Sequence, residues 1–363
     1  MRYRALEVTA PHSLRLAERA GPGLEPDEVL VRVCAVGICG TDLAIVDGSL
    51  SYFREGLMRY PVVPGHEWAG EVVAVGAAVE RVRPGQRVTA ECHIGCARCR
   101  LCRDGRYNLC PRRVRVGLVG LDGACAELVR VPERAVHCLP DHVPCAVGAL
   151  VEPASVALHA LERVGSLGGR RVVVLGAGPV GLLAVAFARA LGAGWIAAVD
   201  LREERLAAAL EVGASQAISA EAQDVLAEVG RATEGDGADV VVEATGNVEQ
   251  FPRALDLAGP GGHVVVISLY KGRPMTLVAD RIVARELTIS GTMAGPGVWE
   301  RVLRLVADGR VALHRLISHR VPLDEAPAAF DLARRPDSGA LKVLIEPNPE
   351  PHPTATPSPE GTA

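Results

Sequence analysis

The 363-residue sequence contains no apolar stretch approaching the roughly 20 residues that a bilayer-spanning helix needs. Its N-terminus, MRYRALEVTAPHSLRL, also lacks the continuous apolar core of a secretory signal peptide. These absences argue against a membrane partner and predict a cytoplasmic protein. Thiols stay reduced in that compartment, so clustered cysteines are more often metal ligands than disulfides.

Lysine is almost absent, and arginine carries nearly all of the positive charge. Lysine occurs only at Lys271 and Lys342, and the formal net charge is −4. This charge argues against nucleic acid as the main partner. A chain of this length is too long for one comfortable hydrophobic core, which predicts two domains.

The pattern of apolar residues changes along the chain. In the first third, valine-rich alternating runs such as DEVLVRVCAVG are separated by glycine and proline, which indicates β structure with many turns. From about Gly169, strand-like runs alternate with helical segments, which indicates a parallel sheet wound on both faces. The sequence therefore predicts the α/β class. Residues 347–363 are Pro-rich and nearly devoid of large apolar groups, so we expect a disordered tail.

Five of the ten cysteines lie between Ala90 and Cys110, and four of these follow the spacing C-x2-C-x2-C-x7-C. These four are Cys96, Cys99, Cys102 and Cys110. Four soft ligands with no obvious open position are typical of structural zinc, while an iron–sulfur cluster and free thiols are the alternatives. The arginines at 98, 100 and 103 are expected to balance part of the thiolate charge.

A nucleotide site is predicted where a strand-like run, RRVVVL, meets a helical one. The glycines of the G-x-G-x-x-G motif are Gly176, Gly178 and Gly181, and Pro179 and Val180 complete the turn. In a strand–turn–helix context this motif binds a pyrophosphate at the helix N-terminus.

The sequence also bears on which dinucleotide binds. Asp200 ends the next predicted strand, where a carboxylate accepts hydrogen bonds from ribose hydroxyls and repels a 2′-phosphate. This favours NAD over NADP. Arg205 and Arg202 are close enough in sequence to contact the cofactor and keep NADP open, although both also fit a solvated helical turn.

Five motifs follow one another in order along the chain. They are GICGTD at 37–42, GHEWAGEVVAVG at 65–76, the four-cysteine loop, LVEPASVALHA at 150–160 and GAGPVG at 176–181. Together they resemble the zinc-containing medium-chain alcohol dehydrogenase superfamily. The Glu-Pro pair in the fourth motif resembles the polyol, threonine and aminocyclitol branch. The stretches YPVVPGHEW, DGACAE and MAGPG also resemble the 2-deoxy-scyllo-inosamine dehydrogenases.

This resemblance implies a two-domain architecture. A GroES-like catalytic β domain would comprise residues 1–153 and 296–346, with a structural zinc loop at 92–110. A Rossmann NAD-binding domain would comprise residues 154–295. Because relatives form dimers and tetramers, a homodimer or homotetramer is expected.

The resemblance also implies a second, catalytic zinc. Cys39 and His66 would bind it, with Glu67 and Glu152 as carboxylate ligands that exchange with water. The alternative for Glu67 is to contact a ligand residue without binding the zinc itself. Such an ion has an open position for an alcohol oxygen and lowers the pKa of the alcohol.

Residues around these ligands have implied roles in proton transfer and substrate contact. Thr41 matches the hydroxyl that takes the substrate proton, and Asp42 is expected to orient a ligand imidazole. Many relatives carry a histidine where this chain has Ala44, so water or the cofactor ribose must pass the proton onward. The candidates for the substrate pocket are the segment from Leu43 to Tyr60, His93, and the segment near Met293.

The expected function is the oxidation of a secondary alcohol on a polar small molecule, with hydride transfer to NAD. The substrate would be a polyol, cyclitol or aminocyclitol. A threonine-type 3-hydroxy amino acid dehydrogenase is the alternative within the same class, weakened by Ala44. A nucleotide-binding protein without catalysis is the alternative from another class.

Overall fold

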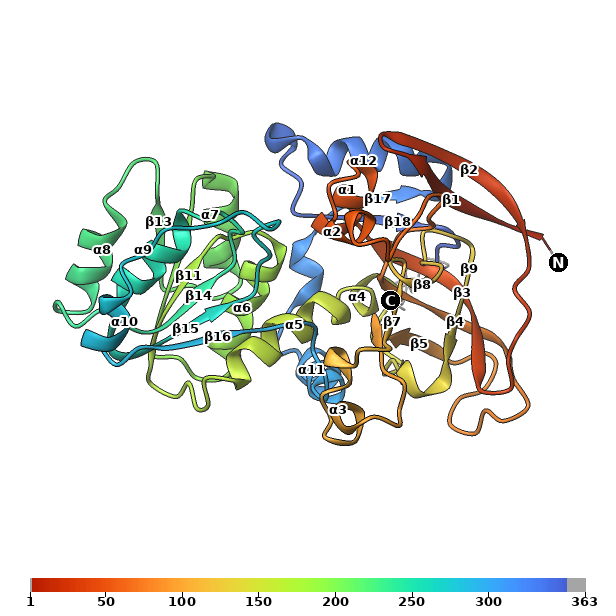
Figure 1. Ribbon diagram of the computed structural model, residues 1–363, viewed down its shortest axis with the longest axis horizontal. Coiled ribbons are helices and arrows are strands. Elements are labelled where there is room, and N and C mark those ends of the chain that lie inside the picture. Colours follow the sequence, from red (N-terminus) through yellow and green to blue (C-terminus); the bar gives the residue numbers. More distant parts are fainter. Residues whose placement is uncertain (1, 351–363) are drawn as a thin grey trace, which may run out of the picture.

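The computed structural model describes residues 2–350, which form two lobes lying side by side (Figure 1). One lobe is built on a six-stranded parallel sheet, and the other on a seven-stranded sheet in which most pairs are antiparallel. The predicted α/β class, with a β domain beside a doubly wound parallel sheet, is confirmed.

The seven-stranded sheet is centred on β3 (Glu28–Gly37), in which only Arg32 is exposed. A strand covered on both faces loses the strict alternation of polar and apolar residues, as this one does. In spatial order the sheet contains β10 (Val136–Cys138), β5 (Arg87–Ala90), β4 (Glu67–Val75), β3, β18 (Lys342–Glu346) and β17 (Ile317–Pro322), with β9 (Leu128–Pro132) also paired to β3.

Two smaller sheets complete the β lobe. An antiparallel hairpin consists of β1 (Arg2–Ala10) and β2 (Ser13–Ala20). A three-stranded sheet consists of β6 (His93–Ile94), β7 (Val114–Val116) and β8 (Gly120–Leu121). Because β6 precedes the four-cysteine segment and β7 follows it, their pairing closes that segment into a loop.

The parallel sheet forms the second lobe. Its spatial order is β13 (Gln216–Ser219), β12 (Trp195–Asp200), β11 (Arg171–Leu175), β14 (Ala238–Glu243), β15 (Ala258–Val266) and β16 (Thr288–Gly291). This is the 3-2-1-4-5-6 order of Rossmann dinucleotide-binding sheets.

Both faces of the parallel sheet are covered by helices. Val172 and Val174 of β11 belong to the hydrophobic core that includes α5 and α6, whereas Val173 and Leu175 belong to the core formed with α8 and α9. Successive side chains of a strand point to opposite faces, so a run of valines suits a strand buried on both sides.

The α-helices connect and flank these sheets (Figure 1). They are α1 (Gly40–Val46), α2 (Ser51–Arg54), α3 (Arg100–Arg103), α4 (Cys145–Gly148), α5 (Val151–Glu162), α6 (Pro179–Ala190), α7 (Glu203–Glu211), α8 (Val225–Ala232), α9 (Gln250–Leu257), α10 (Asp280–Ala284), α11 (Trp299–Ala307) and α12 (Ala326–Arg334). Short 3-10 helices span Tyr107–Leu109, Glu133–Ala135, Leu313–Leu316, Leu323–Glu325 and Pro336–Ser338.

Helix α5 joins the two lobes. It begins at Val151, so the expected domain boundary between residues 153 and 154 falls inside it. Its side chains Ala154, Ala157, Leu158 and Leu161 belong to a core that includes residues of both sheets. The change in sequence pattern marks where the parallel sheet begins, but it does not mark where the preceding helix starts.

The C-terminal residues that the structure describes lie against the β lobe. The Asn348 side chain donates hydrogen bonds of 3.0 Å to the carbonyls of Val33 and Glu127, and Glu350 forms a 3.0 Å ion pair with Arg87. The expectation of disorder from residue 347 is therefore wrong for residues 347–350, because these polar side chains find partners on the β lobe. The rest of the expected tail lies outside the described residues. Within residues 2–350, no helix is long and apolar enough to cross a membrane.

Candidate active site

The four cysteines predicted to bind structural zinc come together in the loop between β6 and β7. Their Sγ atoms all lie within 4.8 Å of one another. Cys99 Sγ is 3.5 Å from Cys102 Sγ and 3.7 Å from Cys110 Sγ. Thiolates around one tetrahedral zinc at ~2.3 Å would be about 3.8 Å apart. The four thiols therefore fit a closed zinc site.

Positive charge reaches this site from a residue that sequence reasoning did not single out. The Arg112 guanidinium donates a 3.3 Å hydrogen bond to Cys96 Sγ, and its backbone amide donates to Cys110 Sγ. The amide of Arg98 and then the Arg112 side chain lower the pKa of Cys96 to about 5. Arg100 donates to Asp104 and Arg103 to the Arg98 carbonyl, so the hydrogen bonds of these two side chains do not reach a cysteine sulfur.

A second group of potential ligands joins Cys39, His66 and Glu67. Cys39 caps the N-terminus of α1, and His66 and Glu67 lie at the start of β4. One donor atom from each lies within 4.8 Å of the others. A thiol, an imidazole and a carboxylate are a donor set typical of zinc. Sequence positions 27 residues apart thus meet because β3 and β4 pair side by side, with Gly37 opposite Glu67.

Asp42 fixes the geometry of this group. Its Oδ2 accepts a 2.9 Å hydrogen bond from the Cys39 amide, and its Oδ1 accepts a 3.1 Å bond from the Gly65 amide. His66 Nδ1 lies 3.4 Å from Oδ1, but the two atoms are not aligned for a hydrogen bond. The carboxylate of Asp42 thus connects the two segments that carry the potential ligands.

Lys342 is the functional residue that sequence reasoning missed. Its Nζ donates a 2.6 Å hydrogen bond to Glu67 Oε2 and a 3.1 Å bond to the Ile38 carbonyl. Both side chains are buried, and although burial lowers the pKa of Lys342, the Glu67 carboxylate raises it overall. The available signal was a rare lysine within the apolar run ALKVLIEP.

Thr41 and Glu152 lie near these ligands. The Thr41 hydroxyl is 3.7 Å from Cys39 Sγ. Glu152, on the first turn of α5, lies outside the group of three whose donor atoms are within 4.8 Å. Burial raises the pKa of Glu152 to about 7, and His66 opposes this shift. Glu152 is therefore adjacent to the metal-ligating group without being part of it.

A narrow cavity lies beside Glu152. Its lining includes His93, Ala294 and Gly295 of the segment after β16, and Trp299. Burial, and then the nearby Arg115, lower the pKa of His93 to about 3, so its imidazole is neutral. The structure thus brings His93 and the segment after Met293 together, as expected for pocket residues.

The glycine-rich turn has the geometry of a dinucleotide site. Gly176 has a φ of +91°, and a Cβ at Gly181 would lie 1.8 Å from the Gly176 carbonyl oxygen. Only glycine fits either position. At Gly178 a Cβ would meet only Arg205, at 3.9 Å, which leaves room for a pyrophosphate. Helix α6 then begins at Pro179, followed by Val180, with its amides available to an anion.

Asp200 lies at the end of β12, where the motif predicts it. Its Oδ2 accepts a 2.7 Å hydrogen bond from the Ala177 amide, and its Oδ1 accepts bonds from Leu201 and Arg202. Arg205 lies 3.6 Å from the same carboxylate, and its Nε is buried without a partner. Arg205 therefore lies at the nucleotide turn rather than on a solvated helical face.

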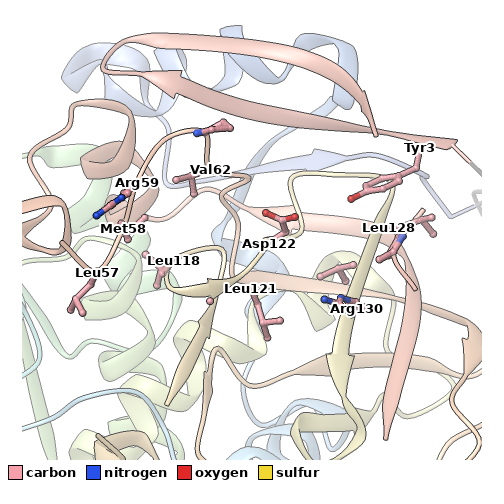
Figure 2. A pocket seen from close by; sticks show the side chains of 14 residues that line it. Tyr3, Leu57, Met58, Arg59, Val62, Leu118, Leu121, Asp122, Leu128 and Arg130 are labelled. Atoms are coloured by element: carbon pink, nitrogen blue, oxygen red, sulfur yellow. The ribbon is translucent and has the colours of Figure 1, made fainter. Parts of the chain in front are cut away.

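Another cavity, of about 300 Å³, lies in the β lobe (Figure 2). Its lining includes Tyr3, Leu121 and Arg130 but no cysteine or histidine. Asp122 pairs with Arg19 and Arg130 with Glu28, so these charges are satisfied within the protein. None of the residues predicted for catalysis lines this cavity.

Two family models match the chain. The model of the alcohol dehydrogenase GroES-like domain matches residues 25–141. The zinc-binding dehydrogenase model matches residues 179–308. The first range contains both groups of potential zinc ligands but not Glu152. The second contains the glycine-rich turn from Pro179 onward.

Individual proteins match over nearly the whole chain. Sorbitol dehydrogenase of Bacillus subtilis strain 168 is 35% identical over 332 residues, covering 90% of this chain and 92% of the relative. L-threonine 3-dehydrogenase of Bacillus licheniformis is 36% identical over 326 residues, covering 89% and 93%. A protein from Sinorhizobium meliloti 1021, assigned as a zinc-binding dehydrogenase and solved with NADP, superposes with a TM-score of 0.88 at 34% identity, covering 96% and 100%. The chain therefore belongs to the zinc-containing medium-chain alcohol dehydrogenase superfamily, close to its sorbitol and threonine dehydrogenases.

Proposed function

We propose that this protein oxidises a secondary alcohol of a polyol, cyclitol or aminocyclitol to a ketone, with hydride transfer to NAD. The observation that carries the proposal is the grouping of Cys39, His66 and Glu67 within 4.8 Å. The adjoining cavity supports it, because Glu152 and the segment that follows the parallel sheet line the same space. The cavity has no room for a water-sized molecule in this structure, so it would have to widen to admit the substrate and the nicotinamide.

Each residue of the group has a distinct task. Cys39 and His66 would hold the zinc, and Glu67, held in place by Lys342, would add a carboxylate beside them. When bound, the zinc supplies a Lewis acid that lowers the pKa of the substrate hydroxyl. Glu152 supplies a further carboxylate that exchanges with water.

Thr41 accepts the proton of the substrate hydroxyl. Its own hydroxyl lies 3.7 Å from Cys39 Sγ, within reach of an alcohol at the site. Ala44, buried in α1, offers no imidazole to carry the proton outward. The proton therefore leaves Thr41 through water or through the ribose of the cofactor.

The cofactor we propose is NAD. The carboxylate of Asp200 accepts backbone hydrogen bonds, yet two oxygens with about four lone-pair sites leave capacity for ribose hydroxyls. A 2′-phosphate would meet this negative charge. Arg205 beside it is the feature that would favour NADP instead.

The test of the proposed function is the Cys39→Ser variant. We expect it to abolish NADH formation and to lower the zinc content by one ion per chain, while the melting temperature changes little. The exposed Cys138 provides the matched control, since Cys138→Ser should retain both activity and zinc. Full activity in Cys39→Ser would remove Cys39 from the metal site and with it the mechanism.

A substrate panel separates the proposed function from the threonine alternative. Sorbitol and inositol should give NADH, and L-threonine should give little. Rapid oxidation of L-threonine together with no polyol turnover would establish the alternative. No reduction of NAD by any alcohol, with zinc present, would indicate a nucleotide-binding protein without catalysis.

A further inference from the structure

Two arginines, Arg115 and Arg113, lie near His93, although neither lines the cavity itself. Arg115 on β7 is the cross-strand partner of His93 on β6, so both side chains project from the same face of the strand pair. His93 lines the cavity that Glu152 also lines. Arg113 belongs to the same segment, and its proximity to Arg115, after burial, lowers its pKa.

The two guanidinium groups have no carboxylate partner among residues 2–350. Arg115 is only 6% exposed, and Nε of both arginines is buried without a hydrogen-bond partner. Arg113 donates only to the carbonyl of Cys110. Lys342, the other buried lysine or arginine among the described residues, is paired with Glu67. An unpaired buried cation is costly, so a partner for these groups is expected to come from outside the chain.

The Arg115 guanidinium stacks on the ring of Tyr52. The guanidinium carbon lies 4.4 Å from the centroid of the Tyr52 ring. Stacking of this kind stabilises the flat face of a guanidinium and leaves its N–H edges free. Those edges match the two oxygens of a carboxylate or a phosphate.

We propose that Arg115, supported by Arg113, binds an anionic group, carboxylate or phosphate, on the alcohol that this enzyme oxidises. The inference rests on the proposed function and narrows its substrate class. An acidic or phosphorylated polyol or cyclitol fits the arginine pair. An ammonium group would be repelled by it, so the amino-substituted class is disfavoured.

Four six-carbon compounds test this preference at a fixed chain length. They are sorbitol, which is neutral, gluconate, sorbitol 6-phosphate, and the amine glucamine. We expect kcat/KM of the zinc-loaded enzyme for at least one anionic compound to exceed that for sorbitol by about 10- to 100-fold, with glucamine below sorbitol. Which anion is preferred distinguishes a carboxylate from a phosphate.

Variants assign the preference to Arg115. Arg115→Gln should lower kcat/KM for the preferred anion by about 10-fold or more, mainly through KM, and should leave sorbitol oxidation nearly unchanged. Arg115→Lys keeps the charge and should recover part of the loss. Arg106→Gln, at an exposed position in the loop that precedes β7, is the matched control and should leave kcat/KM for both substrates unchanged.

The outcomes separate this inference from the proposed function. Equal kcat/KM for sorbitol and both anions, or a preference for glucamine, overturns the inference and leaves the alcohol dehydrogenase intact. A loss of sorbitol oxidation in Arg115→Gln equal to the loss for the anion also overturns it, because Arg115 would then be structural. No oxidation of any of the four, or of other alcohols, overturns the proposed function itself.

Discussion

At the scale of single residues, the ion pair between Lys342 and Glu67 lies closest to the chemistry. Both side chains are at most 3% exposed, and Glu67 is adjacent to two potential zinc ligands. Lys342 neutralises a buried carboxylate and also fixes one of its oxygens. A charge buried in this way destabilises the folded protein when its ion-pair partner is removed.

Lys342→Met should therefore destabilise the protein strongly, since removing one partner of a buried ion pair costs about 3–5 kcal/mol. Chemical unfolding of the zinc-loaded protein measures this loss. Arg32→Met breaks the exposed pair between Arg32 and Glu71 in the same sheet and should cost only about 0–1 kcal/mol. Adding Glu67→Gln to Lys342→Met should recover stability, and a double variant less stable than Lys342→Met would contradict the account.

Asp200 determines the choice of dinucleotide in our proposal. In Asp200→Ser the repulsion of a 2′-phosphate is removed and Arg205 loses its carboxylate partner. We expect the ratio of kcat/KM for NADP to that for NAD to rise by about 10-fold or more, since a charged hydrogen bond is gained where a repulsion was lost. An unchanged ratio would show that Asp200 does not face the ribose, and Arg205→Ala in the same background should abolish any gain.

The sequence predicts potential ligands well because their chemistry resides in residue type and motif. Cys39, His66 and the four loop cysteines are recognisable without coordinates. In the structure the potential ligands of each group lie close to one another. Lys342 and Glu67 are 275 positions apart, so no local pattern reveals that they meet. The same holds for Arg112, whose contact with Cys96 depends on how the loop closes.

At the scale of elements, the four-cysteine loop holds little secondary structure of its own. Within it are one four-residue helix, α3, and the 3-10 turn Tyr107–Leu109. It is anchored to the segment after the parallel sheet, since Asn108 donates to the Met293 carbonyl at 2.6 Å and the Gly297 amide donates to the Tyr107 hydroxyl at 3.0 Å. Metal binding in the loop would therefore support one wall of the proposed substrate cavity.

Cys102→Ser should remove the loop zinc before it affects chemistry. The zinc content is expected to fall by one ion per chain and the melting temperature to drop, because metal-binding free energy stabilises the fold. Elemental analysis and calorimetry measure the two effects, with Cys138→Ser as the unaffected control. If Cys102→Ser retained both zinc ions and its melting temperature, the loop would not be a structural metal site.

Element types were easier to predict than element ends. Valine-rich runs and alternating helices indicate the two kinds of sheet, because burial of whole faces leaves a pattern over many residues. The start of α5 and the order of residues 347–350 depend on single contacts across the fold. Such contacts leave no repeating pattern of apolar residues in the sequence. The sequence therefore does not place the start of α5 or the end of the ordered C-terminal segment.

At the scale of the whole molecule, His137 connects the β lobe to α11. Its ring lies 2.8 Å from Glu300 and 3.2 Å from Glu91, and it stacks on Trp299 with centroids 5.1 Å apart. Burial lowers the pKa of His137, but the carboxylates of Glu91 and Glu300 raise it above the ordinary value. The protonated ring therefore stabilises this contact.

This contact makes stability depend on pH. A raised pKa in the folded state contributes stability fully below the unfolded value of about 6.5, and the contribution is lost as pH rises through the folded pKa. His137→Gln should thus cost about 1.5–3 kcal/mol at pH 5.5 and clearly less at pH 9. Unfolding curves at the two pH values measure this, with the exposed His314→Gln as control. An equal cost at both values would mean that the ring is neutral in the folded protein.

Helix α5 has a consequence for how the molecule comes apart. It starts next to the potential zinc ligands and packs against the parallel sheet. The hydrophobic core of each lobe therefore includes side chains of this helix. Cutting the chain at residue 153 would expose apolar core side chains of each fragment to water. Calorimetry on the intact protein should accordingly record one heat-absorption peak, because the two lobes are expected to unfold together in one cooperative transition.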